Sequence, residues 1–191
     1  MGPGVPLVLI DPLQGGLFLY LYKIQEIISI KVIHLKNVLS NKERIDLLNF
    51  CKPHLLTGEE LSRRFNGCYP PSKQTLSTLH KFDEIRPVIM KIISKVNNET
   101  DLNIGTDKVW MNWNSGKKEE QYWHTHPCDL ALVYYVKTIP FLNDGTCFKD
   151  KFVRSPQNSL IIFPGNKLHS VPSYPFRFER YTLAMDLWLC N

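Results

Sequence analysis

The spacing of apolar residues changes after Gly105, and this change constrains the fold more than any other feature of the chain. Before it, segments 41–51 and 83–97 have helical spacing; the first follows a capping box at Ser40, and the second carries Pro87 in its first turn. After it, apolar residues recur at every second position, which is the pattern of strands. Helices followed by a run of strands favour an antiparallel β protein over a parallel α/β sheet.

About seven short strands are predicted after this change of period. The fold class that follows is mainly β with supporting helices (α+β), arranged as a double-stranded β-helix, the cupin-like jelly roll. An earlier strand is expected over 28–35, and the polar segment 55–80 is expected to be a long loop, either a lid over a site or a plain connector. The predicted later strands are 109–114, 121–126, 130–136, 145–148, 159–163, 168–171 and 178–189.

Composition narrows the class of protein further. A chain of 191 residues fits one domain, which we place at 28–191, with 1–27 as an N-terminal extension. The net charge is only +5 and the basic residues are scattered along the chain, so no nucleic-acid partner is predicted. Five cysteines without a CxxC motif indicate a reducing compartment, and we expect a cytoplasmic protein.

The apolar stretch 17–32 is interrupted by charged residues and is short for a membrane span. It has neither the basic start nor the cleavage site of a signal peptide, so no membrane attachment is predicted. The same apolar stretch is a candidate for pairing two copies of the chain in a homodimer.

Three histidines form the main candidate site. His124 and His126 are two positions apart in a predicted strand, so they project from the same face. Imidazole binds iron, copper, nickel and zinc. His169 follows the turn at Pro164-Gly165, 43 residues after His126. It can reach the end of the predicted barrel at which His124 and His126 lie. One HxH pair is weak evidence, and the third histidine makes a metal site the better interpretation.

Arg180 follows His169 by 11 residues and lies near the start of the last predicted strand. A guanidinium binds a carboxylate through two parallel hydrogen bonds, which suits an acid held inside a barrel. Thr182 lies on the same strand face and can hydrogen-bond that acid. The alternative is a surface arginine beside Glu179.

Several motifs in this order resemble the iron(II)/2-oxoglutarate-dependent oxygenases, and within them the short phage and marine-bacterial group with an HxHP motif. The resemblance covers about residues 108–189. It is carried by an Asn-containing strand, an HxHP turn, a Tyr-Tyr strand, an Asp-Gly pair, and the segments around the last histidine and the arginine: 110–114, 124–127, 132–136, 144–148, 163–164, 169–172 and Arg180.

The resemblance implies a metal triad of two histidines and one carboxylate, with His124 as the first ligand and His169 as the last. This chain departs from the pattern, because His126 stands where the carboxylate belongs. Three interpretations remain open: His126 completes a three-histidine site, Asp129 supplies the third ligand from the next turn, or His126 lines the site without binding.

The resemblance also implies iron(II) and 2-oxoglutarate as cofactors, with ascorbate as reductant, and hydroxylation of an unidentified small molecule or peptide. Arg180 and Thr182 would hold the distal carboxylate of 2-oxoglutarate. Asn112 and Tyr134 are expected to face inward, toward the keto acid or the substrate, and Trp123 is expected to form a pocket wall.

Two other functions fit the same strands. A three-histidine cupin, acting as a dioxygenase or an isomerase, would use the histidines without needing Arg180; a cupin usually adds a glutamate soon after HxH, and only Asp129 is available here. A jelly-roll binding module would use no metal.

Overall fold

The computed structural model describes residues 31–65, 72–114, 123–139, 144–172 and 178–190. The chain divides into two compact units, Met1–Lys31 and Val32–Asn191, and the described helices and strands all belong to the second. The predicted extension 1–27 lies outside the described residues, as do the first residues of the strands expected over 28–35 and 121–126. Among the described residues, no helix has the length and apolar character that a membrane crossing requires.

The two predicted helices are present. Helix α2 spans Asn41–Cys51, and its capping box is formed: the Ser40 hydroxyl accepts from the backbone N–H of Glu43, while the Glu43 carboxylate accepts from the backbone N–H of Ser40 at 2.8 Å. Helix α4 spans Arg86–Glu99, so it begins three residues later than predicted and keeps Pro87 in its first turn.

The prediction of a plain loop over 55–80 was wrong. The described part of this segment contains strand β2 (Leu56–Thr57), helix α3 (Gly58–Phe65), strand β3 (Lys73–Gln74) and the 3-10 turn η2 (Leu79–Lys81); a further 3-10 turn, η1 (Lys52–His54), precedes it. Thr57 and Glu60 form a second capping box, with Thr57 Oγ1 accepting from the backbone N–H of Glu60 at 3.2 Å. That Thr-x-x-Glu signal was available in the sequence.

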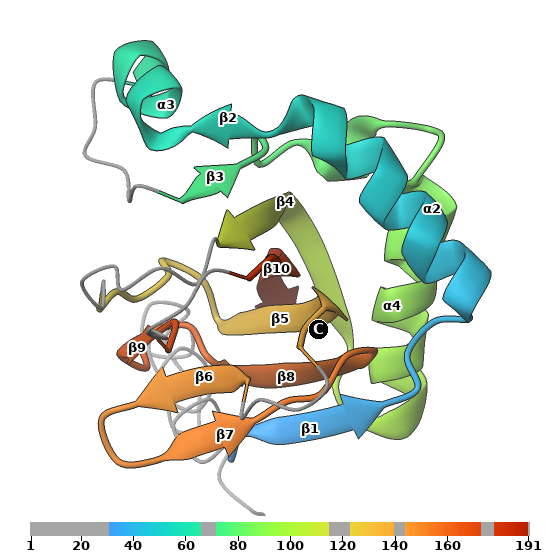
Figure 1. The fold of residues 1–191 in the computed structure, drawn as a ribbon. Coiled ribbons are helices and arrows are strands. Elements are labelled where there is room, and N and C mark those ends of the chain that lie inside the picture. The colour runs from blue at the N-terminus through green and yellow to red at the C-terminus, as the bar shows by residue number, and fades with distance from the viewer. Residues whose placement is uncertain (1–30, 66–71, 115–122, 140–143, 173–177, 191) are drawn as a thin grey trace, which may run out of the picture. The chain divides into compact units, whose positions relative to one another are not determined.

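The remaining strands form two antiparallel sheets. The large sheet has the order β1-β8-β5-β10-β4-β3-β2, and the small sheet has the order β7-β6-β9. This is the predicted α+β double-stranded β-helix, with supporting helices (Figure 1). The strands not yet bounded are β1 (Ile33–Lys36), β4 (Ile104–Asn114), β5 (Leu130–Lys137), β6 (Gly145–Phe148), β7 (Phe152–Arg154), β8 (Ser159–Pro164), β9 (His169–Ser170) and β10 (Arg180–Leu189).

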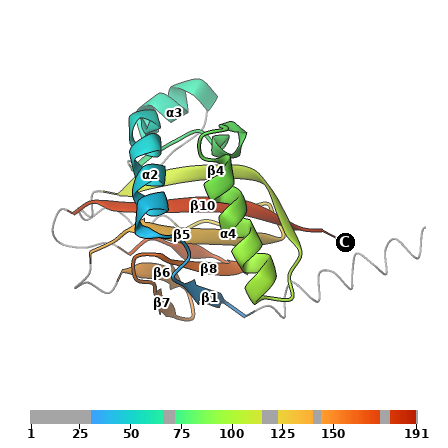
Figure 2. The same ribbon diagram turned by 90° about the vertical axis from the view of Figure 1, so that its right-hand side faces the viewer.

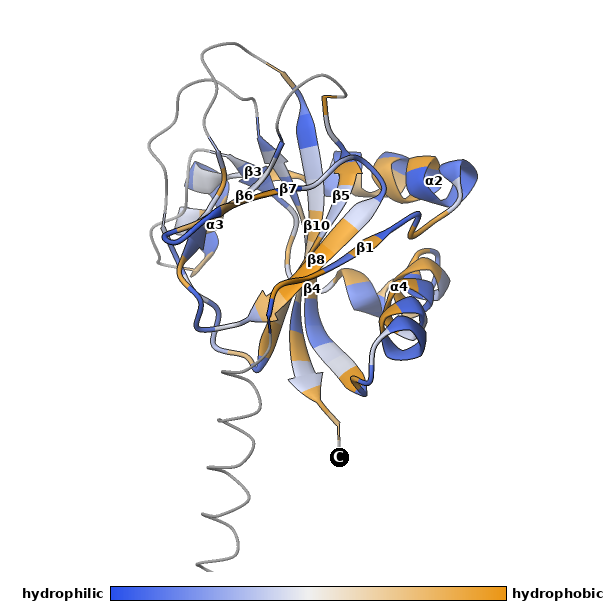
Figure 3. Ribbon diagram, turned by 90° about the horizontal axis from the view of Figure 1, so that it is seen from below, coloured by the Kyte–Doolittle hydropathy of each residue, from blue (hydrophilic) through white to orange (hydrophobic). Residues whose placement is uncertain are grey.

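Helices α2 and α4 cover one face of the large sheet (Figure 2). The Arg44 guanidinium of α2 donates to the backbone carbonyl of Val136 on β5 at 2.9 Å. The other face packs on the small sheet through an apolar cluster that joins Tyr135 and Phe163 to Phe148 of β6. Strand β8 is hydrophobic along its length, because both its faces are covered, whereas the helices alternate in hydropathy (Figure 3).

The register of β10 corrects the expected direction of Tyr134. Thr182 pairs with Tyr135, and Leu183 pairs with Tyr134, so Tyr135 shares the face of Thr182. The Tyr134 hydroxyl instead donates to the side-chain oxygen of Asn158 at 2.9 Å. The inward prediction for Tyr134 was therefore wrong, because adjacent residues of a strand project from opposite faces and the sequence Tyr-Tyr does not say which one faces in.

Replacing Tyr134 with Phe tests this placement through stability. We expect the free energy of unfolding to fall by about 1 kcal/mol, because one buried hydrogen bond is lost and the ring keeps its packing. Denaturant unfolding measures it. Tyr181→Phe is the control, since the Tyr181 hydroxyl donates to exposed Glu179 at 3.3 Å and its loss should cost less. No loss in Tyr134→Phe would contradict the assignment.

Candidate metal centre

Backbone pairing brings the HxH segment against strand β9. The N–H of His124 donates to the carbonyl of His169 at 3.0 Å, and the N–H of His169 donates back to His124 at 3.1 Å. This is an isolated antiparallel bridge, so within the described residues the predicted strand 121–126 is reduced to one pair. Two segments far apart in sequence are thereby fixed at the distance of a sheet ladder.

The turn before β9 holds the second histidine. The N–H of His126 donates to the carbonyl of Gly165 at 2.8 Å, and the N–H of Gly165 donates to the carbonyl of Asp129 at 3.1 Å. A Cβ atom at Gly165 would lie 2.2 Å from the carbonyl oxygen of Cys128, inside van der Waals contact. The turn can approach the HxH segment this closely because residue 165 has no side chain.

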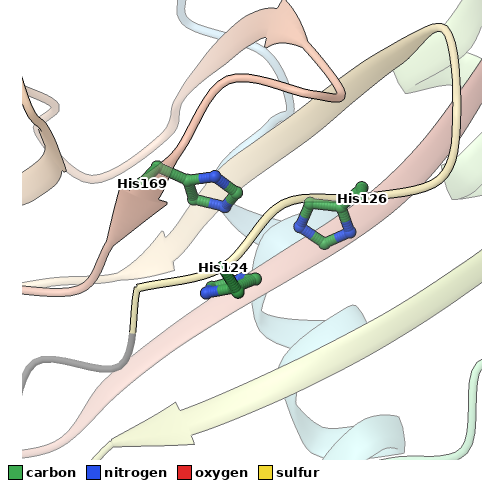
Figure 4. Close-up of side chains that lie close together, drawn as sticks. All are labelled: His124, His126 and His169. Atoms are coloured by element: carbon green, nitrogen blue, oxygen red, sulfur yellow. The ribbon is translucent and has the colours of Figure 1, made fainter.

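The three imidazoles converge in space, with their rings turned toward one another (Figure 4). The ring centroids of His124 and His169 are 4.3 Å apart, and each lies 5.2 Å from that of His126. One nitrogen from each ring lies within 4.8 Å of the others. Nitrogens about 2.1 Å from a shared metal lie at most about 4.2 Å apart, so small side-chain rotations bring all three into coordination. The donor set therefore fits a transition metal.

Hydrogen bonds at Nδ1 orient two of these histidine rings. The Nδ1 of His169 lies 2.9 Å from the carbonyl oxygen of Lys167, and the Nδ1 of His126 lies 3.0 Å from a carboxylate oxygen of Asp186. Because both partners accept hydrogen bonds, we assign the proton to Nδ1 in each ring. The lone pair of Nε2 is then left for a metal, which is the usual arrangement of metal-bound histidine.

Apolar rings surround the histidines. The ring of Phe163 lies 4.6 Å from that of His169, and the ring of Trp110 lies 5.6 Å from that of His126. Burial, together with the nearby His124 and His126, lowers the pKa of His169 to about 3, against a smaller opposing effect of its hydrogen bond to Lys167. His169 is thus a neutral imidazole at neutral pH, which is the form that can bind a metal.

Asp129, the alternative third ligand, is directed elsewhere. Its carboxylate accepts from the backbone N–H of Leu189 at 3.0 Å, and it is absent from the group of converging ligand atoms found among the described residues. This geometry favours His126 as the third ligand.

Arg180 is a buried residue, so the alternative of a surface arginine was wrong. The residue is 1% exposed, and its Nε donates to Asp144 at 2.8 Å while an Nη donates to the carbonyl of Gly145 at 3.1 Å. The guanidinium also lies 5.2 Å from the ring centroid of Tyr135.

Thr182 and Asn112 share the face of Arg180. Thr182 pairs with Asn112, and Arg180 pairs with Asn114, whose side-chain oxygen lies 3.4 Å from the guanidinium. The structure therefore brings three of the residues expected to bind a keto acid onto one interior face. Trp123 directly precedes His124 in the chain, and the ammonium of Lys149 lies 3.9 Å from the centroid of its ring.

Sequence reasoning missed two buried carboxylates, Asp144 and Asp186. Asp144 is 2% exposed and pairs with Arg180. Asp186 is 3% exposed and interrupts an apolar strand. A lone carboxylate in an apolar strand predicts a buried charge with a partner, and that signal could have found Asp186.

Cys128 contacts the same carboxylate but is not an activated nucleophile. Burial raises the pKa of its thiol to about 12, and the nearby Asp186 adds to the shift. Burial also tends to raise the pKa of Asp186, but the hydrogen bond from His126, with the charges of His126 and Lys108, holds that pKa below its usual value. The carboxylate is therefore ionised beside a neutral thiol.

No protein-family model matches the sequence, and no curated protein matches it either. Solved structures do match. The viral collagen prolyl hydroxylase vCPH from Paramecium Bursaria Chlorella virus-1, solved with 2-oxoglutarate, aligns with a TM-score of 0.57 and 15% identity over 84% of this chain and 97% of its own. A Trichoplax adhaerens prolyl hydroxylase, in complex with a peptide fragment of hypoxia inducible factor, aligns with a TM-score of 0.58 and 16% identity over 95% and 94%.

HygX from Streptomyces hygroscopicus, solved with nickel, 2-oxoglutarate and hygromycin B, has a TM-score of 0.61 and 7% identity over 87% of this chain and 86% of its own. At these identities the similarities establish the fold, a double-stranded β-helix also used by 2-oxoglutarate-dependent enzymes. This fold serves many functions, and the residues of the site determine which one a protein has.

Substitutions at His126 and Asp129 test the third ligand. We expect His126→Ala to weaken binding of cobalt(II) on the order of 100-fold, because loss of a ligand should cost at least as much as loss of an outer partner. Asp129→Asn should bind cobalt(II) like the wild type. Isothermal titration of metal-free protein measures both, and the reverse order of effects would make Asp129 the ligand.

Proposed function

We propose that this protein is an iron(II)- and 2-oxoglutarate-dependent dioxygenase of the hydroxylase type. The observation that carries the proposal is the convergence of His124, His126 and His169 in a fold whose interior face also carries Arg180. Bound iron(II) with 2-oxoglutarate would supply oxidative decarboxylation of the keto acid to succinate and carbon dioxide, coupled to oxidation of a substrate by molecular oxygen.

The protein's own residues would divide the work. The three imidazoles hold the metal on one side, in an apolar surrounding that limits access of water. Arg180 and Thr182 bind the distal carboxylate of 2-oxoglutarate, and Asn112 adds a polar contact on the same face. Iron is preferred here over other metals on the strength of the fold and the arginine, since imidazole alone binds several metals.

The ion pair between Arg180 and Asp144 opposes the binding of 2-oxoglutarate. Both side chains are 2% exposed, so water screens their attraction very little. Asp144 holds the guanidinium on the interior face but cancels much of its charge. A second carboxylate therefore binds only if its hydrogen bonds to Arg180 and Thr182 outweigh repulsion from Asp144.

This ion pair also gives the competing function a specific basis. If Arg180 serves only Asp144, the three histidines form a cupin-type site for a metal-dependent dioxygenase or isomerase that uses no keto acid. The two functions differ in one measurable property, the dependence of turnover on 2-oxoglutarate.

The substrate remains a small molecule or a peptide. The structural neighbours include an enzyme solved with an oxygen-degradation-domain peptide and one solved with hygromycin B, so the shared fold accepts both classes. Ascorbate as reductant, Trp123 as a pocket wall and a homodimer stay predictions of the sequence.

Turnover of 2-oxoglutarate to succinate, with iron(II) and ascorbate, tests the main proposal. We expect His124→Ala and His169→Ala to lose turnover to background, because each removes a metal ligand. Arg180→Lys should retain the fold but raise the KM for 2-oxoglutarate at least about tenfold, since an ammonium cannot form the bidentate pair. His54→Ala, at an exposed histidine of η1, is the control. Equal turnover in all variants would refute the proposal.

Asp144→Asn tests the opposition between the ion pair and the keto acid. We expect the Kd for 2-oxoglutarate to fall several-fold, because the amide keeps an acceptor for Arg180 and removes the repelling charge. Titration of the cobalt(II)-loaded protein with 2-oxoglutarate measures it. Weaker binding would show that Asp144 chiefly orients Arg180. Binding to neither protein would favour the cupin-type function.

A further inference from the structure

Asp186 places a carboxylate inside an apolar strand. It lies in β10 between Met185 and Leu187, both fully buried, and its own side chain is 3% exposed. A charge in such a place is costly unless a partner compensates it. The groups that compensate the Asp186 carboxylate therefore indicate its role.

The nearest of its partners is a candidate metal ligand. The Nδ1 of His126 lies 3.0 Å from Oδ1 of Asp186. The thiol of Cys128 lies 3.6 Å from the same oxygen, and the half-exposed ammonium of Lys108 lies 3.7 Å from Oδ2. Lys108 is both more distant and better solvated than His126, so it screens the carboxylate only in part.

The strand pairing is irregular next to this carboxylate. The pairing of β10 with β4 shifts register between Asp186 and Leu187. The Thr106 hydroxyl lies at this irregularity. It is within hydrogen-bond distance of two backbone carbonyls, that of Asp186 at 2.7 Å and that of Lys108 at 3.1 Å. The extra residue is Asp107 of β4, and irregular pairing of this kind is common beside active sites.

We propose that Asp186 is a positioning residue that acts on the metal through His126. It holds the Nδ1–H tautomer of His126, directs Nε2 toward the metal, and returns to the site the negative charge that a carboxylate ligand would carry. This rests on the proposed metal site and extends it, because it explains how a histidine can stand in the carboxylate's place.

The charge balance follows from the ligand set. A triad with one carboxylate cancels one of the two positive charges of a divalent metal, whereas three neutral imidazoles cancel none. The Asp186 carboxylate, 3.0 Å from the Nδ1 of His126, places a negative group next to the ligand shell. It also increases the electron density on Nε2, as carboxylate partners of metal-bound histidines do.

A double-mutant cycle with cobalt(II) as the probe tests the proposal on the full chain. We expect Asp186→Asn to weaken cobalt(II) binding 10- to 100-fold, roughly the cost of losing an outer partner, and to shift the d–d absorption bands. In the His126→Ala background the same change should alter the affinity by less than about twofold, since the effect passes through His126. An equal loss in both backgrounds would overturn the proposal. Asp107→Asn, at an exposed carboxylate that accepts from Trp188, is the control.

A charge swap tests the electrostatic part. His126→Asp alone should bind cobalt(II) weakly, because two carboxylates then face each other. Adding Asp186→Asn should strengthen binding at least about tenfold. No gain from the second change would overturn the charge argument.

The wild-type protein offers a test that needs no stable variant at residue 186. Nitrogen-15 spectra of the metal-free chain at pH 8 should show His126 as the Nδ1–H tautomer, with its signal identified by its loss in His126→Ala. The opposite tautomer would overturn the proposal. If the wild type binds no cobalt(II) at all, the proposed metal site fails as well, whereas binding that ignores Asp186 refutes only the positioning role.

Discussion

The candidate centre depends on the backbone pairing between the HxH segment and the start of β9. Two hydrogen bonds join His124 to His169, and a third joins His126 to Gly165. These bonds fix the spacing of three side chains before any metal is present, so little reorganisation is needed to bind one. The glycine is essential to this arrangement, because a side chain there would collide with the carbonyl of Cys128.

Two buried carboxylates act on this preformed centre in opposite ways. Asp186 lies beside His126 and favours a positive metal, whereas Asp144 lies beside Arg180 and disfavours a second carboxylate. Each is more than nine-tenths buried, so both effects operate with weak screening. In the proposed enzyme, the chain would thus strengthen the site for a cation and set a threshold for the anionic cosubstrate.

The sequence predicted what depends on local periodicity and on residue chemistry. The capping box at Ser40, the change of period after Gly105 and the three histidines all follow from neighbouring residues, and the structure contains them. The direction of Tyr134 could not be predicted, because a strand buried on both faces has no apolar alternation to fix its register. The partners of Arg180 and His126 come from other strands, so only the folded sheet reveals them.

In the proposed site, a histidine in the place of a carboxylate ligand is a change that one residue cannot make alone. A histidine at 126 without a nearby negative charge would leave the metal with one more unit of positive charge, and an aspartate at 126 would face Asp186 across a hydrogen-bond distance. Position 126 and position 186 constrain each other through this short contact. We expect sequences with this fold to carry His and Asp there together, or a carboxylate at the first position without one at the second.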